Sequence, residues 1–350
     1  MKALLLIGGF GTRLRPFTLT TPKALLPVVN KPFILYQLSL LKKYGIEEVI
    51  LGVGYKGYEF KKIQSIAKSL GLRAYLSFEK KPLGTAGGIR NAYKFLKGKE
   101  PFFVFNGDVL ADFNLEAILD FHKGKNAYVT IGVVEVENPS AYGVLVVDEN
   151  RKIEKFIEKP KEPVSNLINA GVYVFQPEVL EEIPPGKEVS VERETFPQIL
   201  EKGKEMYAFL HTGYWLDVGT TDKFMKANFD VLNGKIKLAY EPKDENIEKG
   251  ENTTISEDVK VDGKLITGKN CIVGNGVVIK GNVIAGDGCH IKDGAVIQNA
   301  IIFENVVIGE NSEISNSVIG KEVIIGENCR IRNSFIADKS LLLPFTKMEG

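Results

Sequence analysis

A glycine-rich loop with basic side chains follows the first apolar stretch of the chain. Residues 2–7 have the sequence KALLLI, and GGFGTRLRPFTLTTPK follows at 8–23. Glycines let backbone N–H groups approach phosphate oxygens. An arginine can bind two such oxygens as a planar fork, and a lysine adds a compact positive charge. We therefore expect a phosphate site, rather than a solvated basic turn, formed by Gly8, Gly9, Gly11, Arg13 and Lys23.

The loop differs from two common phosphate-binding motifs. It lacks the G-x-x-x-x-G-K-[ST] pattern of a P-loop. It also lacks the third small residue of the dinucleotide fingerprint, because Leu14 stands where a glycine or alanine belongs. The loop therefore predicts an anion site of another kind.

Two aspartates lie where an apolar stretch gives way to glycine. Asp108 ends FFVFNGD at 102–108, and Asp217 lies within GYWLDVG at 213–219. Carboxylate oxygens are among the ligands that Mg²⁺ prefers, together with phosphate oxygens and water. For either residue alone, the competing explanation is a turn aspartate that hydrogen-bonds the backbone.

The segments that carry these residues alternate between strand-like and helix-like patterns. Strands are expected at 2–7, 47–53, 73–78 and 101–106, helices at 33–45, 58–71 and 88–97, and further short strands between 127 and 175. The alternation predicts an α/β fold with a Rossmann-like, mixed and mainly parallel sheet covered on both faces. Ligands of such sheets bind beyond the carboxyl ends of the strands, which is where the glycine-rich loop lies.

The last part of the chain has an internal repeat with a period of six. Aliphatic or small residues recur at Ile255, Val261, Thr267, Val273, Ile279, Ala285, Ile291, Ile297 and Phe303, slip by one at Ile308 and Ile319, and continue at Ile325, Ile331 and Ala337. The pattern resembles the hexapeptide repeat of left-handed parallel β-helices. We expect a catalytic domain at 1–238, a polar linker at 239–252 and the β-helix at 253–350.

The repeat also accounts for the cysteines. Cys271, Cys289 and Cys329 each lie at the same offset from a repeat position, where a small inward side chain fits. We expect stacked core thiols rather than a disulfide or a metal site, consistent with a reducing compartment.

Composition narrows the class of protein. The chain has 45 Lys and Arg residues against 44 Asp and Glu residues. This balance argues against binding nucleic acid through bulk charge. Apolar stretches are too short to span a membrane and the amino terminus does not resemble a signal peptide. We expect a cytoplasmic protein that binds neither nucleic acid nor membrane.

Several motifs together resemble the sugar-nucleotide pyrophosphorylases. The glycine-rich loop matches the family signature, and PLGTAGG (82–88), FFVFNGDV (102–109), PSAYGV (139–144), FIEKP (156–160), NAGVYVF (169–175), SVERETFPQIL (190–200) and GYWLDVG (213–219) follow in family order. With the C-terminal repeat, the resemblance covers nearly the whole chain. LGTAG, FIEKP and GYWLDVG look most like the GDP-mannose pyrophosphorylases, also called mannose-1-phosphate guanylyltransferases.

The resemblance implies a reaction and a set of site residues. An oxygen of a sugar 1-phosphate attacks the α-phosphorus of a nucleoside triphosphate, and pyrophosphate leaves. The implied catalytic residues are Arg13, Lys23, Asp108, Lys159 and Asp217, with Asp108 and Asp217 as Mg²⁺ ligands. Further nucleotide contacts are implied for Leu6, Gly8, Gly9, Gly11, Thr12, Thr85, Ala86 and Gly87, and sugar contacts for Gly143, Glu158, Lys159 and Asn169.

Glu79 is the candidate that selects the base. Guanine presents two neighbouring donors, N1–H and N2–H₂, and an ionised carboxylate is purely an acceptor. We therefore expect GTP as the nucleotide substrate, and the resemblance implies mannose 1-phosphate as the sugar substrate. The alternatives are a glucose-1-phosphate thymidylyl-, uridylyl- or adenylyltransferase, and a solvated Glu79 with no role in the base site.

Two functions of other classes remain open. One is an acyltransferase site on the β-helix, for which His290 is the one histidine of the repeat, and the other is a non-catalytic regulatory homologue. We expect instead that the β-helix assembles the protein into a homo-oligomer, because its exposed sheet edges need cover.

Overall fold

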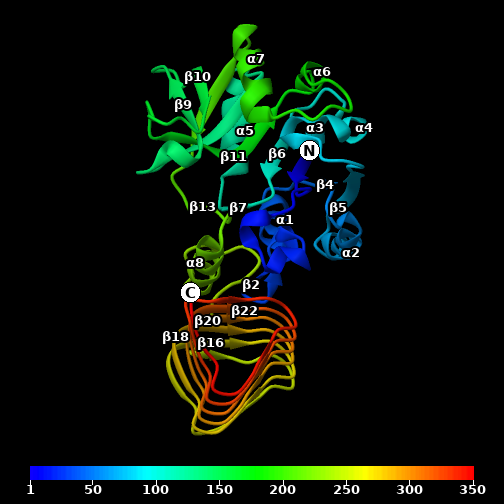
Figure 1. Ribbon diagram of the computed structural model, residues 1–350. Helices are drawn as coiled ribbons and strands as arrows, with labels where there is room; N and C mark the ends of the chain where they lie inside the picture. Colours follow the sequence, from blue (N-terminus) through cyan, green and yellow to red (C-terminus); the bar gives the residue numbers. More distant parts are fainter. The chain divides into compact units, whose positions relative to one another are not determined.

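The computed structural model describes residues 1–350, which form two compact units (Figure 1). One unit contains Met1–Phe10 and Ile34–Asp217, and the other contains Gly11–Phe33 and Val218–Gly350. The chain therefore leaves the first unit within the glycine-rich loop and returns to it at Ile34. These units are defined by contacts, whereas the boundaries predicted above divide the chain by function. Those functional boundaries stay a prediction.

A nine-stranded mixed sheet forms the centre of the first unit. Its main path has the order β10-β9-β11-β6-β1-β4-β5, and β8 and β12 extend it from β11. The strands are β1 (Lys2–Leu6), β4 (Glu48–Val53), β5 (Arg73–Phe78), β6 (Phe102–Asn106), β8 (Val129–Glu135), β9 (Gly143–Val147), β10 (Ile153–Glu158), β11 (Leu167–Phe175) and β12 (Met206–Leu210). The parallel strands β6, β1, β4 and β5 are adjacent, so the predicted α/β sheet is confirmed.

Helices cover both faces of this sheet, and the central strand β1 is therefore buried on both sides. Ala3, Leu4 and Leu5 are fully buried, as expected for a central parallel strand. The helices of the unit are α1 (Ile34–Lys43), α2 (Lys61–Ser69), α3 (Gly84–Asn91), α4 (Tyr93–Leu96), α5 (Leu115–Gly124), α6 (Val179–Glu182) and α7 (Phe196–Glu201). None of the helices in the structure is long and apolar enough to cross a membrane.

The helix predicted at 88–97 begins earlier than the sequence pattern indicates. The structure has α3 from Gly84 and a separate α4 from Tyr93. Glycine lowers helix propensity, so PLGTAGG did not suggest a helix. A Cβ at Gly84 would lie 2.5 Å from Val189 O, and a Cβ at Gly87 would lie 2.5 Å from Lys187 O. The glycines are therefore required for the close approach of α3 to this neighbouring segment.

The second unit combines the end of the glycine-rich loop with the C-terminal half of the chain. Residues 11–33 form the short helices η1 (Thr12–Leu14), η2 (Phe17–Leu19) and η3 (Lys23–Leu25) and the hairpin β2–β3 (Pro27–Val28 and Lys31–Pro32). Helix α8 (Thr221–Leu232) packs against β2. Gly11, Arg13 and Lys23 of the predicted phosphate loop thus belong to a unit with α8 and the repeat, whereas the loop's first two glycines belong to the first unit.

The repeat forms a parallel β-helix, whose stacked coils are visible in Figure 1. Its eight-stranded sheet contains β14 (Ile247–Glu248), β16 (Lys260–Thr267), β18 (Val278–Ala285), β20 (Val296–Ile302), β22 (Glu313–Ile319), β24 (Arg330–Arg332), β25 (Phe335–Ile336) and β27 (Lys347–Glu349). Its six-stranded sheet contains β15 (Thr254–Ile255), β17 (Ile272–Val273), β19 (His290–Ile291), β21 (Val307–Ile308), β23 (Ile324–Ile325) and β26 (Leu341–Leu342). Strand β14 lies inside the segment predicted as a linker and pairs with β16.

The register of the repeat slips earlier than the sequence predicts. Gly281 and Asn282 make the bend of β18, but the single Asn299 makes the bend of β20. Asn299 has a φ of 46°, which asparagine tolerates better than most residues. Ile302 therefore takes the inward position in place of Phe303. A further bend at Asn333 has the same consequence, so that Ile336 rather than Ala337 points inward.

The three cysteines lie in the core of the β-helix, as predicted. Cys271, Cys289 and Cys329 are buried, free thiols within the apolar core cluster. Their Sγ atoms contact backbone carbonyl oxygens, such as Cys289 Sγ and Phe303 O at 3.0 Å. They act as small core side chains.

Candidate active site

The carboxyl ends of the parallel strands bring three predicted site segments of the first unit to one sheet edge. Leu6 pairs with Gly52 on one side and with Asn106 on the other. Gly8 therefore follows β1 at the edge where Asp108 follows β6. Glu79 follows β5, and its N–H donates to Val53 O over 2.8 Å. The parallel direction of these strands thus gathers the candidate nucleotide and metal residues, as ligand sites in such sheets require.

The two aspartates occupy neighbouring positions because two short strands pair. Strand β7 (Val109–Ala111) is antiparallel to β13 (Trp215–Asp217), with Asp217 opposite Val109. Asp217 therefore lies across the ladder from the residue after Asp108. Both residues are half-buried.

Buried oxygen atoms near these aspartates fit a hard cation. Oδ1 of Asn106 and Oδ1 of Asp217 are buried and accept no hydrogen bond. A buried oxygen that is not hydrogen-bonded costs free energy unless another group satisfies it, and Mg²⁺ takes oxygen ligands. The structure has no group of three or more His, Cys, Asp or Glu side chains placed to hold a metal ion. Any Mg²⁺ bound here would therefore need oxygens from substrate or water as well.

Glu79 lies against the glycine-rich loop and the start of α3. A Cβ at Gly8 would lie 3.3 Å from Glu79 Oε1, and a Cβ at Gly88 would lie 2.8 Å from the same atom. The Leu83 N–H donates to Glu79 Oε2 over 3.3 Å. Burial raises the pKa of this carboxyl, an effect that the Leu83 hydrogen bond opposes. Leu6 lies beside Gly88 as well, since its Cδ2 would be 3.4 Å from a Cβ at Gly88.

The three α3 residues that we predict to contact the nucleotide form hydrogen bonds with the segment that follows α6. Thr85 Oγ1 donates to Glu192 Oε2 and accepts from the Val191 N–H, both over 2.8 Å. The N–H of Ala86 donates to Val189 O over 3.0 Å, and that of Gly87 to the same oxygen over 3.3 Å. These contacts show how the loop is held in place, and they leave the predicted nucleotide contacts of Thr85, Ala86 and Gly87 a proposal.

The predicted sugar residues come together where β9, β10 and β11 meet. Glu158 pairs with Gly143, and Ile168, the neighbour of Asn169, pairs with Val144. Gly143 has no room for a side chain, because a Cβ would lie 2.5 Å from Phe156 Cζ and 3.0 Å from Glu158 Oε2. This strand pairing therefore joins all members of the predicted sugar site.

Lys159 and Glu158 form the charged part of this group. Lys159 has a φ of 48° and its N–H donates to Tyr142 O over 3.0 Å. Its Nζ lies 3.7 Å from Glu158 Oε1 and its side chain is largely exposed. Burial and the nearby Glu192 raise the pKa of Glu158, while Lys159 opposes that shift. An exposed cation beside a half-buried carboxylate suits a ligand that has both a phosphate and hydroxyl groups.

Tyr173 connects the candidate sugar residue Asn169 to Asn106, which lies beside the candidate metal residue Asp108, and the sequence did not single it out. Its hydroxyl accepts from Asn169 Nδ2 over 2.8 Å and from Asn106 Nδ2 over 3.5 Å. Tyr173 is fully buried, which raises its pKa well above the usual value, so it stays neutral. The only sequence signal was its place in NAGVYVF, where an apolar strand residue was the simpler interpretation. The sequence pattern did not single out Asn106 or Glu192 either, although they lie in the motifs FFVFNGDV and SVERETFPQIL.

All of the remaining predicted residues except Gly9 belong to the second unit. Gly11 has a φ of 61°, and a Cβ there would lie 3.0 Å from Thr18 and 3.1 Å from Lys23 Cβ. Gly11 is thus required both for its backbone conformation and for the close approach of Lys23. Thr12 and Arg13 are exposed in η1, and Lys23 begins η3 directly after Pro22. In the first unit, Gly9 is exposed with open space around its Cα.

Two family models match the chain. Residues 2–234 match the model described as nucleotidyl transferase, and residues 261–342 match the one described as GMPPB C-terminal domain. The first match contains every candidate site residue. The second falls on the β-helix.

Curated relatives share more than two fifths of their residues with the chain where they align. The mannose-1-phosphate guanylyltransferase catalytic subunit beta of Drosophila melanogaster is 46% identical over 64% of this chain and 61% of its own length. The mannose-1-phosphate guanylyltransferase of Mycobacterium tuberculosis is 43% identical over 67% and 65%, respectively. A probable mannose-1-phosphate guanylyltransferase 2 of Arabidopsis thaliana is 41% identical over 74% and 76%. The chain thus spans less than two thirds of the length of the first two.

Solved structures with a similar fold are more distant in sequence. HddC from Yersinia pseudotuberculosis, complexed with GMP-PN, is 26% identical, with a TM-score of 0.56 over 65% of this chain and 97% of that one. A putative glucose-1-phosphate thymidylyltransferase from Bacillus anthracis is 25% identical, with a TM-score of 0.61 over 68% and 97%.

Proposed function

The chain belongs to the nucleotidyl transferase family, and on that premise we propose that it makes GDP-mannose and pyrophosphate from GTP and mannose 1-phosphate. The observation that carries the proposal is the pairing of β7 with β13, which puts Asp108 and Asp217 at neighbouring positions at the sheet edge. The names of the guanylyltransferase relatives support the choice of substrates.

The chemistry requires charge neutralisation and alignment more than proton transfer. The attacking oxygen of the sugar phosphate is already an anion, so no general base is needed. It forms a bond to the α-phosphorus of GTP while the bond to pyrophosphate breaks, with the two oxygens in line. Arg13 and Lys23 bind the triphosphate and the departing pyrophosphate, and Lys159 binds the sugar phosphate. Positioning and electrostatic stabilisation then account for catalysis.

Asp108 and Asp217 are the residues that would hold Mg²⁺. The ion would neutralise phosphate charge between two anionic substrates. The buried Oδ1 atoms of Asn106 and Asp217 support this assignment. Asn106, through Tyr173, also ties the position of the metal residues to that of Asn169.

Glu79 favours guanine over the other bases. Its carboxylate accepts from guanine N1–H and N2–H₂, beside Leu6 and the glycines at positions 8 and 88. Thymine and uracil present an acceptor next to N3–H and suit an amide better. The thymidylyl and uridylyl alternatives are therefore disfavoured. A comparison of GTP, UTP, dTTP and ATP as substrates tests these two and the adenylyl alternative.

The sugar is held by Glu158, Asn169 and the backbone at Gly143. Glu158 accepts from sugar hydroxyls, while Asn169 can both donate and accept. Asn169 is oriented for this, because its Oδ1 accepts from the Gly171 N–H over 2.9 Å and its Nδ2 donates to Tyr173.

A homo-oligomer formed through the β-helix is part of the proposal. The six-stranded sheet has aliphatic side chains on its outer face: Ile272, Ile324 and Leu341 are 48%, 49% and 65% exposed. They lie one residue before the inward positions Val273, Ile325 and Leu342, so they point outward. Ile324 and Leu341 are neighbours across the sheet, whereas His290 and Val307 lie between Ile272 and Ile324. Exposed aliphatic side chains on one face mark an association surface, and a second copy of this chain is the partner that we propose.

The direct experiment incubates the protein with GTP, mannose 1-phosphate and Mg²⁺ and identifies the product by mass spectrometry. We expect GDP-mannose and pyrophosphate in equal amounts, and neither when one substrate is omitted. Pyrophosphate release without mannose 1-phosphate would contradict the proposed transfer, and turnover of acetyl-CoA would favour the acyltransferase alternative. We also propose a cytoplasmic location, which the three free thiols support.

A further inference from the structure

Phe303 is a large side chain at a position where the other coils of the β-helix have glycine or alanine. The strand register aligns it with Gly268, Gly286, Gly320 and Ala337. Phe303 lies outside the apolar core cluster of the β-helix, yet it is only 2% exposed. Something other than the β-helix core must therefore bury this ring.

Two aromatic rings from other parts of the second unit cover Phe303. The rings of Phe17 and Phe303 are 5.2 Å apart at 56°, and those of Phe224 and Phe303 are 6.2 Å apart at 84°. Both partners are 1% exposed. Tilted and edge-on aromatic pairs of this kind stabilise a contact beyond the area they bury. Phe303 thus joins the segment Gly11–Phe33 and α8 to the side of the β-helix.

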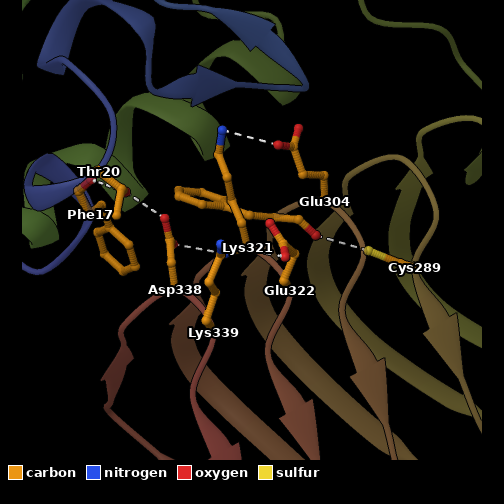
Figure 2. Close-up of polar contacts among 9 residues, drawn as sticks. Phe17, Thr20, Cys289, Glu304, Lys321, Glu322, Asp338 and Lys339 are labelled. Carbon is orange, nitrogen blue, oxygen red and sulfur yellow. Dashed lines mark hydrogen bonds and ion pairs between the residues drawn. The ribbon is translucent and has the colours of Figure 1, made fainter. Parts of the chain in front are cut away.

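A polar contact lies near Phe17, as Figure 2 shows. Thr20 Oγ1 donates to Asp338 Oδ2. Asp338 is itself fixed, because its Oδ1 accepts from the Lys321 N–H over 2.8 Å. Thr20 is therefore bound to a side chain that a backbone N–H of the β-helix holds in place.

The other end of the segment is anchored as well. Val29 has a φ of 44°, which is rare for a β-branched residue and is held only where the surroundings fix it. Its N–H donates to Oδ1 of the buried Asn228 over 2.9 Å. Asn30 Nδ2 donates to Ala285 O of the β-helix over 2.8 Å. Anchors at Phe17, Thr20 and Asn30 thus flank Lys23.

The same segment is folded tightly between these anchors and the phosphate-binding residues. Thr18 Oγ1 donates to Gly11 O over 2.8 Å, and the Leu14 N–H donates to the same oxygen over 2.9 Å. Arg13 is therefore in a turn closed by Thr18, the residue next to Phe17. A displacement of Phe17 would be transmitted to Arg13 through this turn.

We propose that the β-helix positions the phosphate-binding residues Arg13 and Lys23, with Phe303 as the positioning residue. The proposal rests on the proposed function of these two side chains. It gives the β-helix a part in catalysis that is separate from assembly. It also explains why Phe303 departs from the small residues of the other coils.

The test compares Phe303→Ala with the wild-type full-length protein. Alanine is the residue of the aligned coil at Ala337, so the β-helix itself tolerates it. We expect the affinity for pyrophosphate with Mg²⁺, measured by calorimetry, to fall roughly tenfold. Amide hydrogen exchange in peptides covering 11–33 should become roughly tenfold faster, because the segment opens more often. Phe303→Leu keeps an apolar side chain over Phe17. It should therefore weaken pyrophosphate binding less, and speed up exchange at 11–33 less, than Phe303→Ala does.

Ile308→Val is the matched control. Ile308 is fully buried in the β-helix core and belongs to that core cluster. Its truncation should lower the melting temperature while pyrophosphate affinity and exchange at 11–33 stay at the wild-type values. The proposal is overturned if Phe303→Ala behaves like this control.

A second variant approaches the contact from the segment itself. Thr20→Val removes the hydroxyl that donates to Asp338 and keeps the shape of the side chain. We expect a weaker effect in the same direction on both measurements. No change in either measurement for both Thr20→Val and Phe303→Ala would refute the proposal. Absence of GDP-mannose synthesis by the wild type would refute the proposed function instead, because neither measurement depends on turnover.

Discussion

At the scale of single residues, Asp108 and Asp217 have the clearest expected effect on catalysis. Asp108→Asn and Asp217→Asn keep the side-chain shape and remove the negative charge. Loss of a metal-bound carboxylate costs several kcal/mol of transition-state stabilisation, so kcat should fall roughly 100-fold or more in either variant. Steady-state kinetics at saturating Mg²⁺ measures this.

The control for these variants is their stability. Thermal unfolding should show folded proteins, since each substitution is isosteric. A variant that retains the wild-type kcat at saturating Mg²⁺ would remove that residue from the proposed metal site.

Glu79 has a predicted effect on the choice of base. Glu79→Gln can turn an N–H₂ group toward the guanine donors, and an unsatisfied buried polar group costs about 1–3 kcal/mol. We expect kcat/KM for GTP to fall roughly 5- to 150-fold. Turnover of UTP or dTTP should fall less or rise. Equal GTP preference in the variant and the wild type would assign the selectivity to the backbone of α3.

The same residue predicts a pH dependence. Burial raises the pKa of Glu79, and only the ionised carboxylate accepts from both guanine donors. The kcat/KM for GTP should therefore decrease as the pH falls through this raised pKa, and the decrease should be absent in Glu79→Gln. A profile of kcat/KM against pH for both proteins measures it. The same acidic decrease in both would mean that another group titrates.

Residue types revealed only part of the site. The glycines, Arg13 and the aspartates stand out because their chemistry is unusual after an apolar stretch. Tyr173 does not, because its role depends on a hydroxyl that meets Asn106 and Asn169 from other strands. That meeting depends on sheet order and a register shift in β11, which the sequence pattern does not specify.

At the scale of elements, the packing of α3 gives a direct test. Gly87→Ala would put a Cβ 2.5 Å from Lys187 O and 2.9 Å from Leu83 Cβ. Overpacking of this kind costs about 1–3 kcal/mol, so the melting temperature should fall. Gly124→Ala in α5 is the matched control, because no atom lies within 4 Å of its Cβ. It should leave the stability unchanged or raise it by up to about 1 kcal/mol. Equal stability of the two variants would contradict this packing.

Strands were easier to predict than turns. Buried stretches such as 2–7 and 47–53 correspond to β1 and β4, because a central parallel strand must be apolar throughout. The inward positions at Phe303 and Ala337 were wrong, because one asparagine replaced a two-residue bend. A turn shortened by one residue leaves almost no mark in a hydrophobic pattern but shifts every later position.

At the scale of the whole molecule, the exposed aliphatic side chains of the six-stranded sheet predict self-association. Ile324→Asp puts a charge between Val307 and Leu341 on the outer face of the six-stranded sheet, and it should reduce the apparent mass in solution, because burial of an unpaired charge is costly. Gln298→Asp introduces the same charge on the outer face of the eight-stranded sheet, where Gln298 is exposed. Light scattering of both variants and the wild type is the measurement. An unchanged oligomer in Ile324→Asp would exclude this face as the interface.

The measurement that tests the central claim most directly is a matrix of kcat/KM values, read by pyrophosphate release. It combines GTP, ATP, UTP and dTTP with mannose 1-phosphate and glucose 1-phosphate in the wild-type protein. We predict the highest value for GTP with mannose 1-phosphate and a requirement for Mg²⁺ in every active pair. A higher value for dTTP with glucose 1-phosphate would contradict the guanylyltransferase assignment, and no release with any pair would contradict nucleotidyl transfer itself.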